Sequence, residues 1–348
     1  MITQQLREFV ERIPKAELHC HVEGSIQPRT ALELASEHGL KMPFNDEMGA
    51  RRFFEFTSLN QFIEVFNLVS DTLRTPSDFK RVTVDLGADA RSQNILYREV
   101  FFTFYAHDSR KIPWEVVIEG LAEGRKECWD RFGVELQFIA DIARHMEARD
   151  GLLTVERAYS SRQKAGIIAI GLDSAERGNP ASRHKMGFDR ARDLGFHLVA
   201  HAGEDVGPES VWDAIKSLKV ERIDHGVRSV DDPTLVKYLV DLQTPLTVCP
   251  ISNVALKIYP NMKLHPVKRL LDAGVFVTIN SDDPAMFKAN LVENFLRVAD
   301  TFDLTAAEIQ RLARNAFEAS FLDGAAKRRF LDKFDAEASE LRRALHLS

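Results

Sequence analysis

The sequence predicts a single α/β domain with the (β/α)8 TIM-barrel architecture. Eight short apolar segments alternate with helical segments between residues 16 and 280. Reactive side chains gather at the C-terminal ends of these segments, which is where the active site of such a barrel lies. These ends include the first segment and the last, and only a closed barrel brings those two strands together. An open doubly wound sheet is disfavoured because no Gly-x-Gly-x-x-Gly motif follows a strand.

The composition is that of a soluble globular protein. The 348 residues are 45% hydrophobic and carry a formal net charge of −6, so there is no basic stripe for nucleic acid and none is expected as a partner. Cys20, Cys128 and Cys249 are too few and too far apart for a disulfide framework or a four-cysteine zinc site. The N-terminal segment has helical rather than signal-peptide spacing, and no apolar run can span a bilayer. We therefore expect a cytoplasmic protein that does not engage a membrane.

The first half of the chain alternates strands and helices and contains one insertion. A helix over 2–13 ends at Pro14 and is followed directly by a strand over 16–21. The insertion begins with a helix from Pro28 and continues with an aromatic stretch over 53–69 at helical spacing. Core packing is the simpler interpretation of that stretch, although its position also favours a lid or wall for a ligand. Further strands are predicted over 95–104, 135–142 and 167–172, with helices over 77–93, from Pro113 and over 152–163.

The second half repeats the alternation and ends in helices. The predicted strands cover 196–205, 222–227, 246–249 and 275–280, with helices over 183–194, from Pro208, over 233–240 and over 266–273. After residue 283 only helices are expected, and one begins with a capping box, Thr305-x-x-Glu308. Because a barrel needs about 250 residues, the N-terminal helix, the insertion and the C-terminal helices account for the surplus. No linker or low-complexity run divides the chain, so we expect one domain over residues 1–348.

Imidazole and carboxylate groups stand at three strand ends that closure would bring together. His19 and His21 share one face of the first strand because side chains alternate, which turns Cys20 away into packing. His201 ends the fifth strand and Asp282 follows the eighth. Three imidazoles and a carboxylate suit zinc, with iron also possible. Such a metal lowers the pKa of a bound water to roughly 7.

Three further groups are free to handle protons. Glu204 and Asp283 lie next to the proposed ligands in sequence, and His225 ends the adjacent sixth strand. Each of these residues alone is a weak signal, because a buried histidine capped by a carboxylate is more often structural. Their occurrence at several strand ends of one barrel favours a metal-dependent hydrolytic site.

Five motifs resemble the adenosine and adenine deaminase branch of the amidohydrolase superfamily. They occur in register over nearly the whole chain, and together they are far more specific than any one of them. The motifs are Pro14-Lys-Ala-Glu-Leu-His-Cys-His-Val-Glu-Gly24, His201-Ala-Gly-Glu204, Asp224-His-Gly226, Cys249-Pro-Ile-Ser-Asn253 and Ser281-Asp-Asp-Pro284.

The resemblance implies one zinc ion per subunit and a role for each matched residue. Binuclear relatives bridge their metals through a lysine on strand four, but here that strand ends in Gly171-Leu-Asp-Ser174, which favours a single metal. Ser252 and Asn253 are expected to support the site from a turn. The implied roles are metal ligation by His19, His21, His201 and Asp282, a proton donor at Glu204, an orienting base at His225 and a purine contact at Asp283.

The resemblance also implies a mechanism for an amino-purine. Addition of water to the ring carbon that bears the amine breaks aromaticity, so Glu204 is expected to protonate the neighbouring ring nitrogen. A glutamate that is protonated near neutral pH needs a raised pKa, which a dry pocket supplies. Asp283 is expected to accept a hydrogen bond from the imidazole part of the purine. Ammonia then leaves and the oxo-purine remains.

Two departures from the nucleoside-type pattern concern the substrate. Adenosine deaminases usually carry aspartate, which meets the ribose, where this chain has Glu23, and a Gly-Asp-Glu sequence near Glu176. The chain is more similar to the adenine deaminase type, which implies substrate contacts at Glu23, Ser174 and Glu176, the last to a ring N–H that only a free base has. We predict conversion of adenine to hypoxanthine and ammonia in purine salvage, with adenosine a poor substrate. The alternatives are an enzyme that deaminates adenosine or an N6-substituted adenine, a non-purine hydrolase of this fold, and an inactive binding protein. The sequence does not indicate an oligomeric state.

Overall fold

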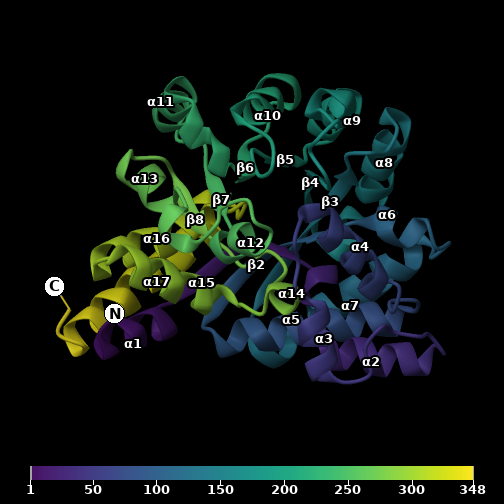
Figure 1. Ribbon diagram of the computed structural model, residues 1–348, viewed down its shortest axis with the longest axis horizontal. Coiled ribbons are helices and arrows are strands. Elements are labelled where there is room, and N and C mark those ends of the chain that lie inside the picture. The colour runs from purple at the N-terminus through teal and green to yellow at the C-terminus, as the bar shows by residue number, and fades with distance from the viewer. Residues whose placement is uncertain (1, 348) are drawn as a thin grey trace.

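The computed structural model describes residues 2–347, which form a barrel of eight parallel strands surrounded by helices (Figure 1). The strand order in the sheet is the order in the sequence. This arrangement confirms the predicted fold class. The strands are β1 (Lys15–His21), β2 (Ile95–Phe102), β3 (Glu135–Ala143), β4 (Ile167–Asp173), β5 (His197–Ala202), β6 (Arg222–His225), β7 (Leu246–Val248) and β8 (Val277–Ile279).

Backbone hydrogen bonds join the first strand to the segment after the last. The Asp282 N–H donates to the carbonyl of His19 at 3.1 Å, and the His21 N–H donates to the carbonyl of Asp282 at 2.9 Å. These bonds form an isolated parallel bridge in which Cys20 pairs with Asp282. Barrel closure therefore sets Asp282 beside the two histidines of β1.

The insertion after β1 differs from the sequence prediction in one respect. The aromatic stretch over 53–69 is not one helix, because the chain turns between two helices and the Ser58 side chain caps the second by accepting from the Gln61 N–H. Phe54 and Phe56 lie in this turn and are buried. The helices of the first half are α1 (Gln4–Arg12), α2 (Pro28–Glu37), α3 (Glu47–Phe53), α4 (Leu59–Ser70), α5 (Pro76–Ser92), α6 (Phe104–Asp108), α7 (Trp114–Phe132) and α8 (Ala148–Ala165).

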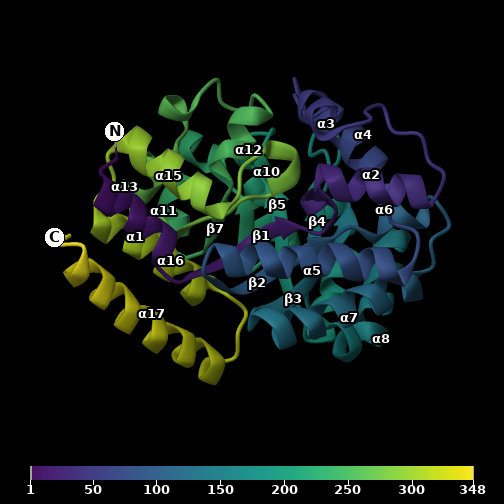
Figure 2. The same cartoon turned by 90° about the horizontal axis from the view of Figure 1, so that it is seen from below.

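The second half ends in helices that pack beside the N-terminus. Both chain ends lie on the same side of the barrel, next to α17 (Figures 1 and 2). The capping box at Thr305 and Glu308 is present, as predicted. The helices are α9 (Lys185–Asp193), α10 (Pro208–Asp213), α11 (Pro233–Leu242), α12 (Pro250–Ala255), α13 (Val267–Asp272), α14 (Pro284–Phe287), α15 (Leu291–Phe302), α16 (Ala306–Ala319) and α17 (Gly324–Ala344).

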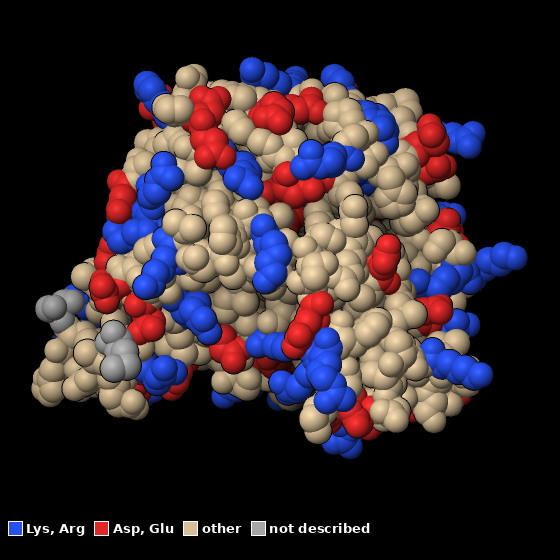
Figure 3. Space-filling model, viewed as in Figure 1, with Lys and Arg blue, Asp and Glu red and all other residues tan. Residues whose placement is uncertain are grey.

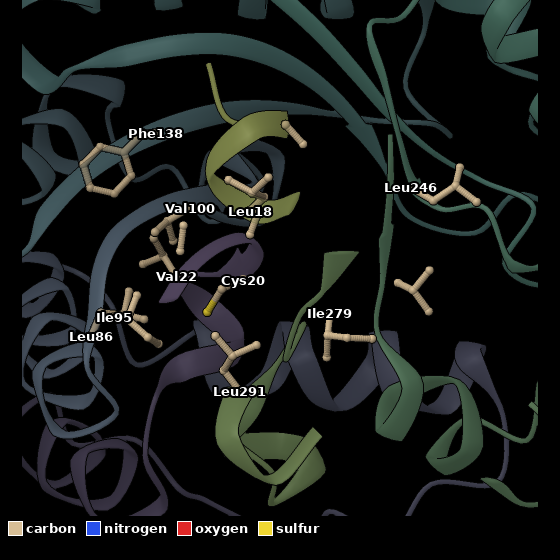
Figure 4. Packing of buried hydrophobic residues seen from close by; sticks show 14 of the residues in the cluster. Leu18, Cys20, Val22, Leu86, Ile95, Val100, Phe138, Leu246, Ile279 and Leu291 are labelled. Carbon is tan, nitrogen blue, oxygen red and sulfur yellow. The ribbon is translucent and has the colours of Figure 1, made fainter. Parts of the chain in front are cut away.

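The two faces of β1 have different surroundings. Leu18, Cys20 and Val22 belong to the main apolar cluster, near Val100 of β2 and Leu86 of α5 (Figure 4). This placement confirms the packing role predicted for Cys20. A separate small cluster joins residues from four other strands inside the barrel, and polar side chains take over towards the C-terminal strand ends. That inner cluster comprises Phe101, Ile139, Ala169 and Val199.

The surface carries charges of both signs. Acidic and basic side chains are interspersed over the face shown in Figure 3, in keeping with the small net charge. Within residues 2–347, no helix combines the length and the apolar character needed to cross a membrane.

Candidate active site

Four side chains converge at the C-terminal end of the barrel. His19 and His21 come from β1, His201 from β5, and Asp282 follows β8; one ligand atom from each lies within 4.8 Å of all the others. The Nε2 atoms of His21 and His201 are 3.3 Å apart. Oδ1 of Asp282 is 3.1 Å from Nε2 of His19 and 3.4 Å from Nε2 of His21.

These separations fit a single metal ion. Ligands about 2.0–2.1 Å from a tetrahedral zinc lie about 3.3 Å from one another. The tautomer of His19 is suitable as well, because the Thr247 hydroxyl donates to Asp224 at 2.8 Å and so accepts from Nδ1–H of His19 at 3.0 Å. Nε2 of His19, which has no hydrogen-bond partner, is then left with its lone pair facing the cluster. This cluster can therefore hold a metal ion.

The chain turns sharply where the strands deliver these residues. His225 at the end of β6 and Asp282 after β8 have φ values of +62° and +67°. Gly203 after β5 has φ +67°, and a Cβ there would lie 2.5 Å from Val211. Non-glycine residues in this region store strain of about 1–3 kcal/mol each and are often found at functional sites.

A cavity of about 330 Å³ opens over the cluster, near the lower end of the size range of ligand pockets, roughly 300–1,000 Å³. Helix α4 supplies an apolar wall, so the aromatic stretch borders a ligand site as well as packing in the core. The remaining wall is largely polar. The lining residues are His21, Leu59, Phe62, Ile63, Phe66, Asn67, Thr103, Tyr105, Ala106, His145, Asp173, Ser174, His201, Glu204, His225, Leu256, Asp282 and Asp283.

Glu204 and His225 face each other in this cavity, with Oε1 and Nε2 3.7 Å apart. Burial, and then the nearby Asp282 carboxylate, raise the pKa of Glu204 well above its usual value. Burial lowers the pKa of His225 to about 3. Burial and Asp282 likewise raise the pKa of Asp283 well above its usual value. Burial in this cavity therefore favours the neutral forms of both Glu204 and His225.

Glu176 lies behind the cavity lining rather than in it. Its Oε1 accepts from the Gly203 N–H at 2.7 Å and the Ser210 hydroxyl at 2.8 Å. Its Oε2 accepts from the N–H groups of residues 204–206 at 3.0–3.1 Å. Five donors exceed the roughly four lone-pair sites of a carboxylate, which leaves no capacity for a substrate. In this structure Glu176 holds the loop after β5 and stands outside the lining, where the sequence predicted a contact with a ring N–H.

Glu23 also sits behind the lining. Its Oε1 accepts from the His107 ring at 2.8 Å and from the Thr103 N–H at 3.3 Å. Thr103 stands on the cavity side of this carboxylate. In this structure Glu23 supports Thr103 and stands outside the lining, where the sequence predicted a substrate contact, because the helix turn after β1 carries the side chain away from the lining.

Asp173, unlike Glu23 and Glu176, lines the cavity, and the sequence did not predict a role for it. It accepts hydrogen bonds from the Thr103 hydroxyl and, at 3.1 Å, from the Ser174 hydroxyl. Ser174 lines the cavity, as its predicted role requires. Strand alternation carried the signal, since Ala169, Gly171 and Asp173 share one face of β4 and Ala169 points into the barrel.

Comparisons with known proteins agree with this geometry. The adenosine deaminase family model matches residues 14–337. The adenine deaminase of Cupriavidus necator is 40% identical over 334 residues, covering 96% of this chain and 95% of the relative. That of Crocosphaera subtropica is 41% identical over 322 residues, covering 92% and 98%. The crystal structure of adenine deaminase from Arthrobacter aurescens superposes with a TM-score of 0.90 at 35% identity, covering 95% of this chain and 99% of the other.

The family match spans both ends of the barrel and every strand that contributes to the cluster. The fold, the convergence of three histidines with an aspartate and the match over most of the sequence lead to one conclusion. The chain belongs to the adenosine deaminase family.

Proposed function

We propose that this chain is a zinc-dependent adenine deaminase that hydrolyses adenine to hypoxanthine and ammonia in purine salvage. The observation that carries the proposal is the buried Glu204, its pKa raised by burial, facing a cluster that can hold a metal ion within one cavity of suitable size. The relatives named adenine deaminase support the choice of substrate.

The buried cluster supplies a donor set that suits zinc, since nitrogen and oxygen ligands are its usual partners. When bound, the metal supplies a water activated at neutral pH, its pKa lowered to roughly 7. Asp282 is fixed by more than its bridge to β1, because the Ser252 hydroxyl donates to its Oδ2 at 2.6 Å. The ligands we assign are His19, His21, His201 and Asp282.

Glu204 acts as the general acid in this proposal. Its proton goes to the ring nitrogen beside the carbon that bears the amine, which makes that carbon electrophilic. Asp283 lines the same cavity and its Oδ1 has no hydrogen-bond partner, so it is placed to bind the imidazole part of the purine. The apolar wall from α4 excludes water from the flat face of the ring.

Asp173 and Ser174 are suited to bind the edge of the purine that distinguishes a free base from a nucleoside. Free adenine presents an N9–H donor beside the N3 acceptor. A carboxylate that accepts two hydroxyl donors keeps about two acceptor sites for a substrate N–H, and the Ser174 hydroxyl helps to hold Asp173 in place by donating its one proton to it. A ribose on N9 removes the donor and leaves the Asp173 carboxylate with an unmet acceptor. We therefore place the preference for adenine at Asp173 rather than at Glu23 or Glu176.

The test is ammonia release from adenine, adenosine and 9-methyladenine at matched concentrations. Adenine should have the highest kcat/KM, because sites built to pair a substrate N–H reject analogues that lack it, by up to about 10⁴-fold. Asp173→Ala should raise KM for adenine and narrow this preference, whereas Glu23→Gln should leave the preference unchanged. A higher kcat/KM for adenosine in the unmodified enzyme would overturn the free-base assignment and leave the metal chemistry standing.

A further inference from the structure

A line of hydrogen bonds runs from the start of helix α13 to His225. The backbone N–H of Val267 lies 3.2 Å from Nδ1 of His265. Nε2 of His265 is 3.1 Å from Oδ1 of Asn253, and Nδ2 of Asn253 is 3.3 Å from Nδ1 of His225. All three side chains are at most 2% exposed, so water does not compete for these contacts.

The donor and the acceptor in each of these hydrogen bonds follow from the first bond, which the Val267 N–H makes. A backbone N–H can only donate, so Nδ1 of His265 is an acceptor and the proton of this neutral ring is on Nε2. The Val267 N–H is free to make this bond because it stands in the first turn of α13, where N–H groups have no partner within the helix. Burial lowers the pKa of His265 to about 3, which agrees with a neutral ring.

The Asn253 amide links His265 to the active site. Nε2–H of His265 requires an acceptor, so the amide oxygen of Asn253 faces it and the amide nitrogen faces His225. An amide nitrogen only donates, so Nδ1 of His225 is an acceptor and its proton is on Nε2. The Val267 N–H, which can only donate, thus determines the tautomer of His265, the orientation of the Asn253 amide and the tautomer of His225 in turn.

We propose that His265 and Asn253 are positioning residues that hold the neutral imidazole of His225 with its proton on Nε2, so that His225 faces the cavity as a hydrogen-bond donor. This inference deepens the proposed deaminase function and rests on it for its catalytic meaning. Nε2 of His225 lies 3.7 Å from Oε1 of Glu204 and 4.0 Å from Oδ2 of Asp282. A fixed donor there can bind a lone pair of the attacking oxygen and so orient it towards the ring carbon.

The sequence-based role of His225 changes in one respect. It still orients the attacking oxygen, but in this tautomer Nε2 has no lone pair with which to accept a proton. His225 therefore acts as a donor rather than as the base, and the proton lost by the attacking water passes to Glu204, which is a carboxylate once it has protonated the ring nitrogen. The asparagine of the Cys249–Asn253 motif and the distant His265 acquire a joint role, which is to select the tautomer.

The tautomer can be measured without an activity assay. In the zinc-loaded full chain labelled with nitrogen-15 at histidine, ring nitrogen shifts distinguish a bare from a protonated nitrogen, and a His225→Gln sample identifies the signals of His225. At neutral pH we expect a bare Nδ1 and a protonated Nε2. In Asn253→Asp the carboxylate can only accept, so Nδ1 of His225 should become protonated. A protonated Nδ1 in the unmodified enzyme would overturn the inference.

Steady-state kinetics with adenine provide the second test of the positioning role. Asn253→Asp should lower kcat for adenine 10²- to 10⁴-fold with KM within three-fold, since a wrong histidine tautomer costs serine proteases about 10⁴ in kcat. If that variant fails to fold, His265→Leu and His265→Gln are tested instead. The leucine variant should lower kcat at least ten-fold. The glutamine variant, which restores a hydrogen-bond donor to Asn253, should keep kcat within five-fold of that of the unmodified enzyme. Equal losses for both would mean that packing alone matters. Absence of adenine turnover in the unmodified enzyme would refute the proposed function, whereas the nitrogen shifts would still decide the tautomer.

Discussion

Replacing Glu176 with glutamine separates the role predicted from the sequence from the role seen in the structure. The change keeps the size and shape of the side chain and exchanges one carboxylate oxygen for an NH2 group. If Oε1 keeps the Gly203 N–H and the Ser210 hydroxyl, the new NH2 faces the three N–H groups of residues 204–206, which now meet a donor instead of Oε2. Arg144, whose Nη2 is 3.9 Å from Oε1, loses its nearby anion as well.

The structure sets the size of the expected effect. A hydrogen bond to a charged group contributes about 1.5–3 kcal/mol, so the loss of three such bonds sets an upper limit of about 9 kcal/mol on the loss of stability. The loop can relax towards water, and breaking a buried charged contact usually costs about 3–5 kcal/mol. We therefore expect Glu176→Gln to lower the free energy of unfolding by about 3–5 kcal/mol. Because Glu204 is in the loop that loses its anchor, kcat should fall at least ten-fold.

Denaturant unfolding and steady-state kinetics together test this prediction. The matched control is Glu156→Gln, because Glu156 pairs with Arg190 at 2.7 Å on the surface, where such pairs contribute about 0–1 kcal/mol. A substrate contact at Glu176 would instead raise KM for adenine and leave unfolding unchanged. Stability of Glu176→Gln within about 1 kcal/mol of the unmodified protein would refute the loop-holding role.

Three further predictions concern the metal and the acid. Glu204→Gln should keep metal and fold but lose several orders of magnitude in kcat, because an amide cannot serve as the general acid; near-normal turnover would refute the mechanism. His201→Ala should lose bound metal and activity together, and full metal content by elemental analysis would show that His201 is not a ligand. Since Glu204 must carry its proton and its pKa is raised, kcat should fall as pH increases through the range of that pKa. A pH profile in which kcat rises across that range would contradict the assignment of the acid.

The sequence predicted the strands and the cluster because both depend on short-range rules. Alternation along β1 places His19 and His21 on one face, and barrel closure brings Asp282 beside them. The histidines stand on strands, and Asp282, three residues after β8, is bridged to β1 through its backbone, so barrel closure determines their neighbourhood. The family resemblance then added the expected roles of Glu204 and His225.

The carboxylates Glu23 and Glu176 could not be placed from sequence, because both follow a strand end by two or three residues. Their direction depends on the turn after the strand: Glu23 starts a short 3₁₀ helix, and Glu176 follows Ser174, which has φ +70°. Each carboxylate then finds backbone N–H donors that belong to another segment of the chain. The break between α3 and α4 was missed for a related reason, since Ser58 ends the helical run by capping rather than by interrupting the apolar pattern.

The residues around the cluster are thus positioned by buried polar contacts as much as by apolar packing. His225 and Asp282 adopt left-handed backbone conformations, and strain of about 1–3 kcal/mol at each must be offset by contacts such as the Asp282 bridge to β1. Two substitutions that each preserve the shape of the side chain should therefore distinguish contacts that stabilise the fold from contacts that orient a catalytic group. Glu176→Gln removes acceptors from a loop and should lower both stability and kcat. Asn253→Asp reverses one hydrogen bond and should lower kcat far more than stability, because the new carboxylate still has a donor on each side once the ring protons move.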